Sequence, residues 1–239
     1  MSAPGGVGIR GRAAGTDHAG HSLAFLIDDY PTMSHMCDDM MTGNNTSGQV
    51  GVWGMTFAVI GAGGVTRIAS EAGHPGIWRM TTDSVADGNH GLFTWTGNAH
   101  HLNSETFDLL VNCRWNQINT TVRHRVGFGS SAEPPVDGMY IEKLAADTSW
   151  FGVCRASSVE TRTAALLTAD TSFHTFRIRR LNSSTIGFTI DRGEEALVTA
   201  NIPTAVTNVI VYVETAEAVA KTLDFDLIDY LVTGMTARV

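Results

Sequence analysis

Residues 173–191, FHTFRIRRLNSSTIGFTID, decide the fold of this chain. Two stretches, 173–179 and 185–191, alternate apolar and polar side chains, which is the period of a β-strand with one buried face. The residues between them, LNSS at 181–184, are typical of a turn. The segment therefore predicts an antiparallel β-hairpin.

The same signal extends outward in both directions. Further runs of β-branched, aromatic or alternating residues are separated by Gly, Asn, Asp and Ser, and they lie at 50–60, 77–81, 91–95, 107–115, 122–128, 139–142, 150–154, 209–213 and 223–232. Many short strands at this spacing are typical of a sandwich or jelly roll. We therefore predict an all-β, antiparallel, two-sheet jelly-roll sandwich.

Three finer expectations follow from the same runs. The strand at 107–115 places four apolar side chains on one face: Phe107, Leu109, Val111 and Cys113. The strand at 122–128 is expected to pair with it. A short helix is expected at 33–41 or at 214–221.

The N-terminal part differs from the rest in composition. Residues 1–24 are rich in Gly, Ala and Ser without apolar periodicity, which predicts an extended arm that gains order on a partner. We divide the chain into an arm and lead-in segment, 1–46, and the jelly roll, 47–239. No apolar leader or membrane-length run is present in the sequence, so neither export by a secretory signal nor a spanning helix is expected.

Charge and cysteine content limit the partners. The formal net charge is −8, and no basic stripe exists, so nucleic acid and anionic membranes are not expected partners. Alternation divides the densest basic run between two strand faces: Arg177, Arg179 and Arg180. The number of cysteines is odd and no CxxC pair occurs, which favours single buried thiols and leaves one disulfide open. They are Cys37, Cys113 and Cys154.

The last third resembles a known fold family. The hairpin, then NIP at 201–203, then the acidic and apolar strand LDFDLIDYLV at 223–232, resemble the closing half of a concanavalin A-like (lectin or glucanase-type) jelly roll. In that family a strand ends in a short turn similar to the one at 191–193, and an acidic-apolar strand follows. The resemblance implies a two-sheet sandwich.

A second resemblance concerns the middle of the chain. DDY at 28–30, WG at 53–54, a glycine-rich break at 61–64 and EAGHPGIWRMTT at 71–82 resemble structural proteins of tailed bacteriophages that carry a GHPG-type motif before such a jelly roll. The matching residues are Gly73, His74, Pro75 and Gly76. Glycines permit positive φ and proline fixes its own φ, so the motif also predicts a sharp structural turn that His74 caps.

No carboxylate pattern indicates catalysis. A glucanase of this fold needs closely spaced acids that point into one cleft. Glu105 and Asp108 are three residues apart, so on a strand they face opposite sides. Asp224 and Asp226 share a face that we expect to be solvated, and Asp229 lies on the other face. We therefore predict no catalytic residues and no enzyme activity.

Metal and cofactor motifs are also weak. His18 and His21 lie three residues apart beside Asp17, but nothing marks a fourth ligand, and the GAGG stretch lacks the lysine of a phosphate-binding loop. We predict no metal and no cofactor.

Large aromatic residues offer the remaining candidate site. All five tryptophans lie on predicted strands, where core positions are the usual role: Trp53, Trp78, Trp95, Trp115 and Trp150. Trp95 and Trp115 are the candidates for stacking on a sugar in a lectin-type site.

The resemblances imply a structural protein of the bacteriophage virion. We expect a capsid decoration (cement) protein, made in the host cytoplasm, that docks on the major capsid protein or other virion subunits and forms a homo-oligomer, a trimer. Its assembly arm would use Arg10, Arg12, His18 and His21. The alternative is a tail or tail-tip protein with a glycan-binding jelly roll. A carbohydrate-active enzyme would instead require two convergent carboxylates in a groove.

Overall fold

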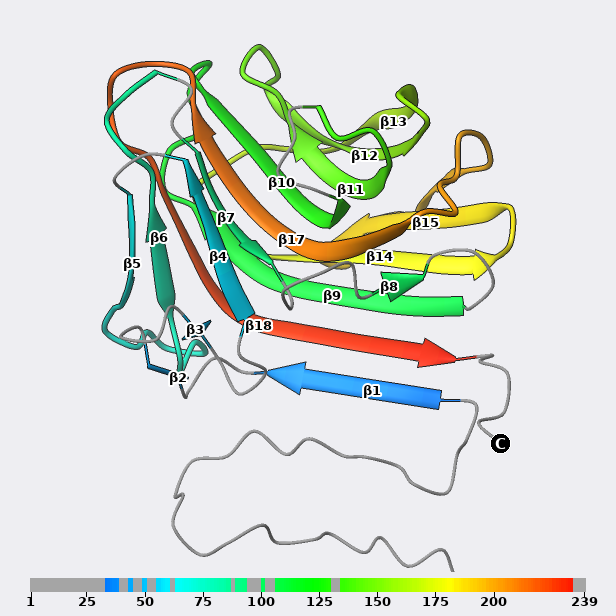
Figure 1. The fold of residues 1–239 in the computed structure, drawn as a ribbon, viewed down its shortest axis with the longest axis horizontal. Coiled ribbons are helices and arrows are strands. Elements are labelled where there is room, and N and C mark those ends of the chain that lie inside the picture. Colours follow the sequence, from blue (N-terminus) through cyan, green and yellow to red (C-terminus); the bar gives the residue numbers. More distant parts are fainter. Residues whose placement is uncertain are drawn as a thin grey trace, which may run out of the picture.

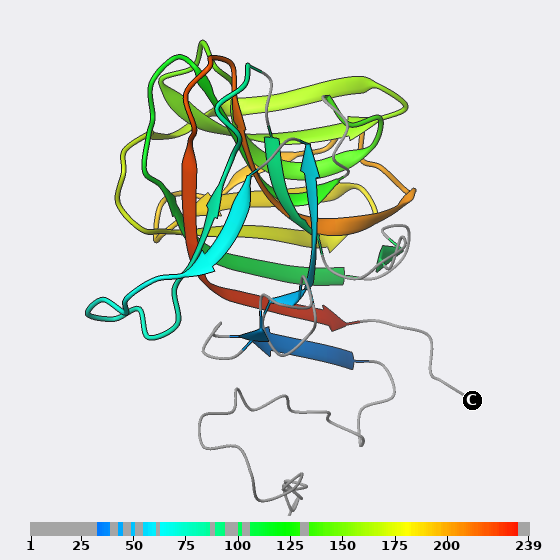
Figure 2. The same ribbon diagram turned by 60° about the vertical axis from the view of Figure 1, so that its left-hand side comes forward.

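The computed structural model describes residues 33–38, 43–44, 49–50, 55–60, 63–86, 89–93, 100–101, 106–129 and 134–233. Over these ranges the regular structure is β, arranged as two antiparallel sheets packed face to face (Figures 1 and 2). The predicted all-β jelly-roll sandwich is confirmed. The predictions for Arg10, Arg12, His18, His21 and Trp95 lie outside the described residues.

The first sheet, sheet A, has eight strands among the described residues. In spatial order they are β16 (Ala196–Val198), β15 (Thr185–Ile190), β14 (His174–Asn182), β9 (Thr106–Trp115), β18 (Thr222–Thr233), β6 (Trp78–Thr81) and β5 (Gly64–Arg67), and β1 (Met33–Asp38) also pairs with β18. The hairpin predicted from 173–191 is β14 and β15. It occupies one side of this sheet.

The second sheet, sheet B, has ten strands in the described part of the chain. Their order is β13 (Val159–Thr168), β12 (Ser149–Ala156), β11 (Gly138–Lys143), β10 (Val122–Gly129), β17 (Val206–Thr215), β7 (Asn89–Phe93), β4 (Met55–Ile60), β3 (Gln49–Val50) and β2 (Gly43–Asn44), while β8 (His100–His101) pairs with β17. Strands β10 and β17 curve strongly (Figure 1).

Three local predictions are wrong. Where a helical turn was expected at 33–41, the described residues 33–38 form strand β1, and 214–221 holds the end of β17 followed by bends. Strand β10 does not pair with β9, because β9 lies between β14 and β18 in sheet A while β10 lies between β11 and β17 in sheet B. Strands β9 and β10 follow each other in the chain but belong to different sheets, and local alternation carries no information on that choice. The domain boundary at 46/47 stays a prediction.

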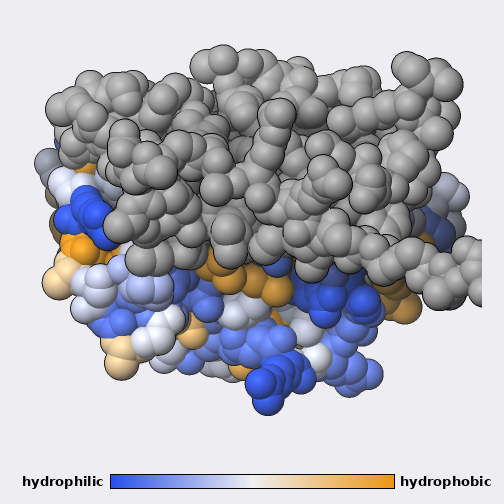
Figure 3. All heavy atoms as spheres, turned by 90° about the horizontal axis from the view of Figure 1, so that it is seen from below, coloured by the Kyte–Doolittle hydropathy of each residue, from blue (hydrophilic) through white to orange (hydrophobic). Residues whose placement is uncertain are grey.

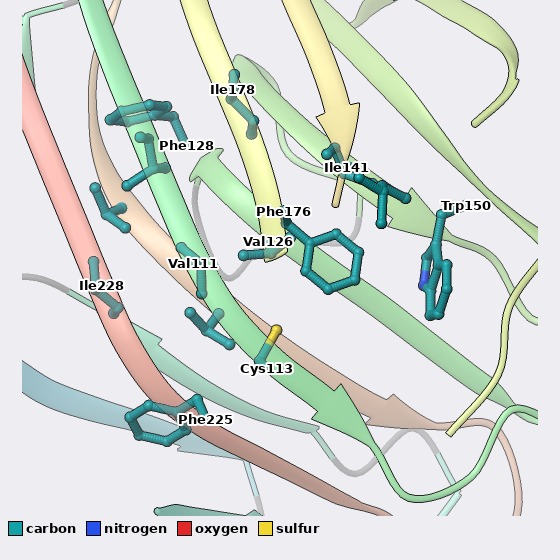
Figure 4. Close-up of a cluster of buried hydrophobic side chains, with 14 of the residues drawn as sticks. Val111, Cys113, Val126, Phe128, Ile141, Trp150, Phe176, Ile178, Phe225 and Ile228 are labelled. Carbon is teal, nitrogen blue, oxygen red and sulfur yellow. The ribbon is translucent and has the colours of Figure 1, made fainter. Parts of the chain in front are cut away.

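The core lies between the sheets. It gathers apolar side chains from alternate positions of both, and Figure 4 shows Val111, Cys113, Phe176 and Phe225 of sheet A near Val126, Ile141 and Trp150 of sheet B. The face predicted for Phe107, Leu109, Val111 and Cys113 is confirmed, since each is at most 5% exposed. At roughly 1.5–3 kcal/mol for each large apolar side chain removed from water, this layer is the main source of stability.

The buried cysteines are free thiols. Cys113 and Cys154 belong to the core and form no disulfide, as predicted. Burial raises the pKa of Cys113 well above its ordinary value, and it raises the pKa of Cys154 to about 12. Both are therefore protonated and inert near neutral pH. The side chain of Cys37 lies outside what the structure describes.

The backbone of β10 needs glycine at one point. Gly127 has φ +142°, a value that L residues rarely adopt. A Cβ atom there would lie 2.6 Å from the Cα atom of Tyr140 and 2.6 Å from Cδ1 of Ile178. The absence of a side chain lets β10 and β11 approach each other beneath Tyr140.

The surface seen from below mixes hydrophilic and hydrophobic residues (Figure 3). In the part of the chain that is described, no helix has the length and apolarity needed to cross a bilayer.

Candidate functional site

The GHPG segment forms a turn before β6. Glu71 and His74 exchange two backbone hydrogen bonds of 3.1 and 2.9 Å, and Gly73 between them has φ +83°. The Pro75 carbonyl accepts a hydrogen bond of 2.6 Å from the Ser70 hydroxyl. The tight turn thus spans 71–74, and the chain then enters the buried start of the strand.

The His74 side chain attaches this turn to sheet A. Its Nδ1 atom forms a hydrogen bond with the Asp226 carboxylate, and its ring stacks on Phe173 with centroids 3.8 Å apart. The Arg114 guanidinium lies 4.5 Å from the centroid of the same phenyl ring. Phe173 therefore contacts a residue from the turn and a residue from β9.

Asp224 is the centre of the ion pairs around the turn. Its carboxylate is 0% exposed and accepts bonds of 2.6 and 2.8 Å from Arg79 and of 2.9 Å from Arg114. Arg114 also donates to Glu71 at 2.6 and 2.9 Å. Burial opposes ionisation, but hydrogen bonds from Arg79, Asn116 and Arg114 lower the pKa of Asp224 overall. The set Glu71, His74, Arg79, Arg114, Asp224 and Asp226 is called the Asp224 network below.

The expectation of a solvated face at Asp224 and Asp226 is wrong. Their side chains are 0% and 7% exposed. A register irregularity between Phe225 and Leu227 makes Asp226 an extra residue in β18, which turns it toward His74. Asp229 is half-buried. The partners that permit burial come from distant parts of the sequence, so the strand pattern did not reveal them.

Two more ion pairs continue along the outer face of sheet A. Arg177 bonds to Asp108 at 2.8 Å, and Arg179 bonds to Glu195 at 2.7 and 2.8 Å. Arg180 points to the other side and is 2% exposed, so the predicted division of the basic run is confirmed. Charges on this face are thus held in fixed pairs.

The outer face of sheet B carries a second polar group. On β10, β11 and β17, residues that alternate with core positions point away from the core, and six of them form what is called the Arg125 cluster: Arg123, Arg125, Tyr140, Glu142, Tyr212 and Glu214. Apart from Arg123, each is at most 2% exposed.

The Arg125 guanidinium lies among aromatic rings and acids. Its Cζ atom is 4.6 Å from the Tyr140 centroid and 5.4 Å from the Tyr212 centroid, within cation–π range. Its Nη2 atom lies 3.4 Å from Oε2 of Glu142. The Tyr212 hydroxyl donates a bond of 2.5 Å to Glu214, which also pairs with Arg123.

The Tyr140 hydroxyl is a polar atom without a hydrogen-bond partner among the described residues. The residue is 0% exposed, and burial, with the charge of Glu142 second, raises its pKa. A buried hydroxyl without a hydrogen-bond partner is costly, so its presence needs an explanation.

The two carboxylates of the cluster lie on either side of β10, and each pairs with an arginine of that strand. Glu142 and Glu214 lie on strands separated by β10, with their Cα atoms about 12 Å apart from strand spacing and rise. Arg125 and Arg123 occupy the intervening strand and pair with them. Aromatic rings, guanidinium groups and carboxylates are thus brought together on this face, and all of them except Arg123 are buried.

Trp115 does not line this site. It is 1% exposed in the core, stacks on His124 at 4.5 Å and donates from Nε1 to the Tyr212 carbonyl at 3.2 Å. Trp115 was one of two candidates for stacking on a sugar, but its side chain points between the sheets, so it has the core role that is usual for such aromatic residues. Trp78 and Trp150 are core residues, as the usual role of such aromatics predicts.

Sequence reasoning missed the Arg125 cluster. Its one local signal was the Arg–His–Arg alternation at 123–125, which placed two arginines on the face opposite Val122 and Val126. The other members come from β11 and β17, and only strand pairing brings them together. Within the described ranges no group of three metal-ligating side chains was found.

Comparison with known proteins places the chain in a family. A family model described as "SO2946-like, C-terminal domain" matches residues 73–229. Protein SO2946 of unknown function from Shewanella oneidensis MR-1 has a similar structure, with a TM-score of 0.68, 14% identity and coverage of 87% of this chain and 90% of that chain. No curated protein matches.

Two further solved structures share the fold. The β-glucanase of Bacillus licheniformis has a TM-score of 0.53 at 13% identity, covering 82% of this chain and 97% of that one. The binding domain of botulinum neurotoxin DC, in complex with rat synaptotagmin II, has a TM-score of 0.53 at 9% identity, covering 85% and 49%. They establish a concanavalin A-like, glucanase-type jelly roll. With the family model matching most of its length, the chain belongs to the SO2946-like family.

Proposed function

We propose that this chain is a non-catalytic structural component of a bacteriophage particle, a decoration protein that docks on the capsid shell. The observation that carries the proposal is that the charged side chains on the outer face of sheet A are held in ion pairs while remaining partly exposed. Arg79 and Arg114 pair with Asp224, Arg177 pairs with Asp108, and Arg179 pairs with Glu195. Side chains fixed in this way give a rigid, preorganised docking surface.

The sequence supports the position in a particle. The segment at 71–82 resembles phage structural proteins, and the composition of 1–24 fits an arm that lies on neighbouring subunits. Ordering such an arm costs about 1–2 kcal/mol per residue, which repeated contacts over a shell can offset. The proposed partners are the major capsid protein and further copies of this chain in a homotrimer, and the proposed location is the virion.

The test is the composition of purified particles. We expect mass spectrometry to detect the chain in virions of the phage that encodes it, and cryo-electron microscopy to place its jelly roll on the shell. A variant lacking residues 1–24 should keep its melting temperature but lose particle binding. Absence of the chain from intact virions would refute the proposal.

A second candidate is a glycan-binding protein of the tail or tail tip, and the Arg125 cluster favours it. Two tyrosine rings, a guanidinium group and the unbonded Tyr140 hydroxyl are groups that recognise sugar hydroxyls and ring faces. Because five of the six members of the cluster are at most 2% exposed, a sugar would reach them only after the groups that cover them move aside. Solved jelly rolls of this fold include a β-glucanase and a neurotoxin whose cell entry depends on "interaction with two ganglioside molecules".

Glycan arrays separate the two candidates. A glycan binder should lose binding at least tenfold in the Tyr140→Phe variant, about 1.4 kcal/mol, since one hydrogen bond to the sugar is removed. A Tyr230→Phe variant, altered in the core, is the matched control. Incubation of the wild-type protein with β-glucans should give no reducing ends; turnover would overturn the non-catalytic role.

A further inference from the structure

Strand β13 forms one end of sheet B. It is ten residues long and pairs with β12 along one side. The sheet order ends at β13, and no strand of the described ranges pairs with its other side (Figure 1). A long edge strand presents backbone N–H and C=O groups that can pair with another chain.

The C-terminal half of β13 lacks the residues that usually protect an edge. Residues 163–168, TAALLT, contain no charge and no proline. Ala164 and Ala165 are exposed, whereas Leu166 and Leu167 pack partly against the core. The charges of the strand lie before this half, where Glu160 pairs with Arg155 and Arg162 pairs with Asp147.

An exposed apolar residue lies on a strand that contacts β13. Strand β16 is at one end of sheet A, and its Leu197 is 56% exposed. Solvated edges of monomeric proteins normally carry lysine or proline at such positions.

We propose that β13 is a self-association edge, which pairs antiparallel with β13 of a second copy of this chain. Two β13 strands related by a twofold axis perpendicular to the sheet run antiparallel. The backbone N–H and C=O groups of both edges then form hydrogen bonds with each other. The neutral 163–168 segments meet without placing like charges opposite each other, although each copy carries a net charge of −8.

The contact is expected to be weak and dependent on concentration. The pairing of β12 with β13 has register irregularities between Trp150 and Phe151 and between Phe151 and Val153, which bend the edge and limit the length that a second copy can pair. A twofold contact is compatible with a separate threefold contact. The proposed β13 contact involves two copies of this chain alone, so it can be tested with the purified protein, whether or not the chain is part of a virion.

Sedimentation of the full chain measures the association. We expect the wild-type mass to rise toward an even-numbered assembly with concentration, and the Ala165→Lys variant to dissociate about tenfold more easily, because two ammonium groups would be brought close together at the twofold axis. Val219→Lys, at an exposed valine outside this edge (54%), is the matched control and should behave as wild type. Equal association of the Ala165→Lys and wild-type proteins overturns the proposal.

Crosslinking tests the contact directly. Ala164→Cys and Ala165→Cys proteins should form disulfide-linked dimers on mild oxidation at high concentration, whereas Val219→Cys should not. Wild-type protein gives the background, since Cys113 and Cys154 are buried. Circular dichroism confirms that each variant is folded. If the Val219→Cys protein crosslinks as fast as both edge variants, the proposed pairing is refuted.

Discussion

The outer faces of the two sheets use the same chemistry in different surroundings. In sheet A, Arg79 and Arg114 pair with a buried aspartate while remaining 34% and 18% exposed. In sheet B, Arg125 and Glu142 are 2% and 3% exposed. A partly exposed arginine keeps part of its hydration, whereas in a fully buried pair both the arginine and the carboxylate lose their hydration.

This difference indicates different roles. The Asp224 network joins the turn at 71–74 to β6, β9 and β18, and so it acts as a clamp. The Arg125 cluster joins adjacent strands that backbone hydrogen bonds already hold together. A buried ion pair in such a place contributes little net stability relative to apolar residues of similar size.

The largest expected effect is at Glu142. The Glu142→Leu variant should lose about 3–5 kcal/mol of unfolding free energy, because the buried Arg125 guanidinium would then face a leucine. Denaturant unfolding measures the loss. The Arg125→Met, Glu142→Leu double variant should recover most of it; a double variant no more stable than the single one would mean that the pair is structural.

Asp224 comes next. The Asp224→Ala variant should lose about 3 kcal/mol, the lower end of the range for a broken buried pair, because Arg79 and Arg114 can turn toward water. Thermal and denaturant unfolding measure it, and hydrogen exchange should increase at 71–77. A loss below 1 kcal/mol would show that Asp224 does not hold the turn.

The third prediction concerns the pH dependence of stability that the buried His124 causes. Burial, and then the charge of Lys143, lower the pKa of His124 well below 6.5, so the folded state binds fewer protons than the unfolded chain. This contribution to stability is complete above pH 6.5 and is lost as pH falls toward the folded pKa, by up to about 1.4 kcal/mol per unit.

Unfolding measured from pH 7.5 to 5 tests this. The His124→Gln variant should have a flatter pH dependence than wild type. The lowered pKa of Asp224 affects stability in a different pH range. Its contribution to stability is present above the ordinary pKa of 3.8 and is lost only at lower pH. Parallel curves for the two proteins would contradict a neutral buried His124.

The smallest expected effect is at Asp108. It pairs with Arg177 on the outer face of sheet A, and the two side chains are 28% and 40% exposed. The Asp108→Ala variant should therefore lose less than about 1 kcal/mol, and salt should reduce the difference. Both Asp108 and Asp224 are aspartates paired with arginine, and they differ in burial. If the Asp108→Ala and Asp224→Ala variants lost similar amounts of unfolding free energy, burial would not explain the strength of the Asp224 pairs.

Local periodicity was enough for much of the fold. The hairpin at 173–191, the single-faced strand at 107–115 and the division of Arg177, Arg179 and Arg180 follow from alternation alone, since side chains of a strand point to opposite faces. These predictions required no knowledge of strand partners.

The sites depended on contacts between distant segments. Asp224 was expected in water because its partner Arg79 lies 145 residues away, and Trp115 was a candidate for stacking on a sugar because its stacking on His124 was not known. The Arg125 cluster combines three strands from 123 to 214. Pairing order between sheets is a long-range choice that alternation does not encode.

By itself, then, the sequence determined that this protein is an all-β sandwich with one apolar face on each strand, because the two-residue period is a local property of the chain. Only the tertiary structure decided that β9 and β10 belong to different sheets and that Asp224 and Arg125 are buried among partners. The physical reason is that burial and ion pairing depend on which strands meet in space.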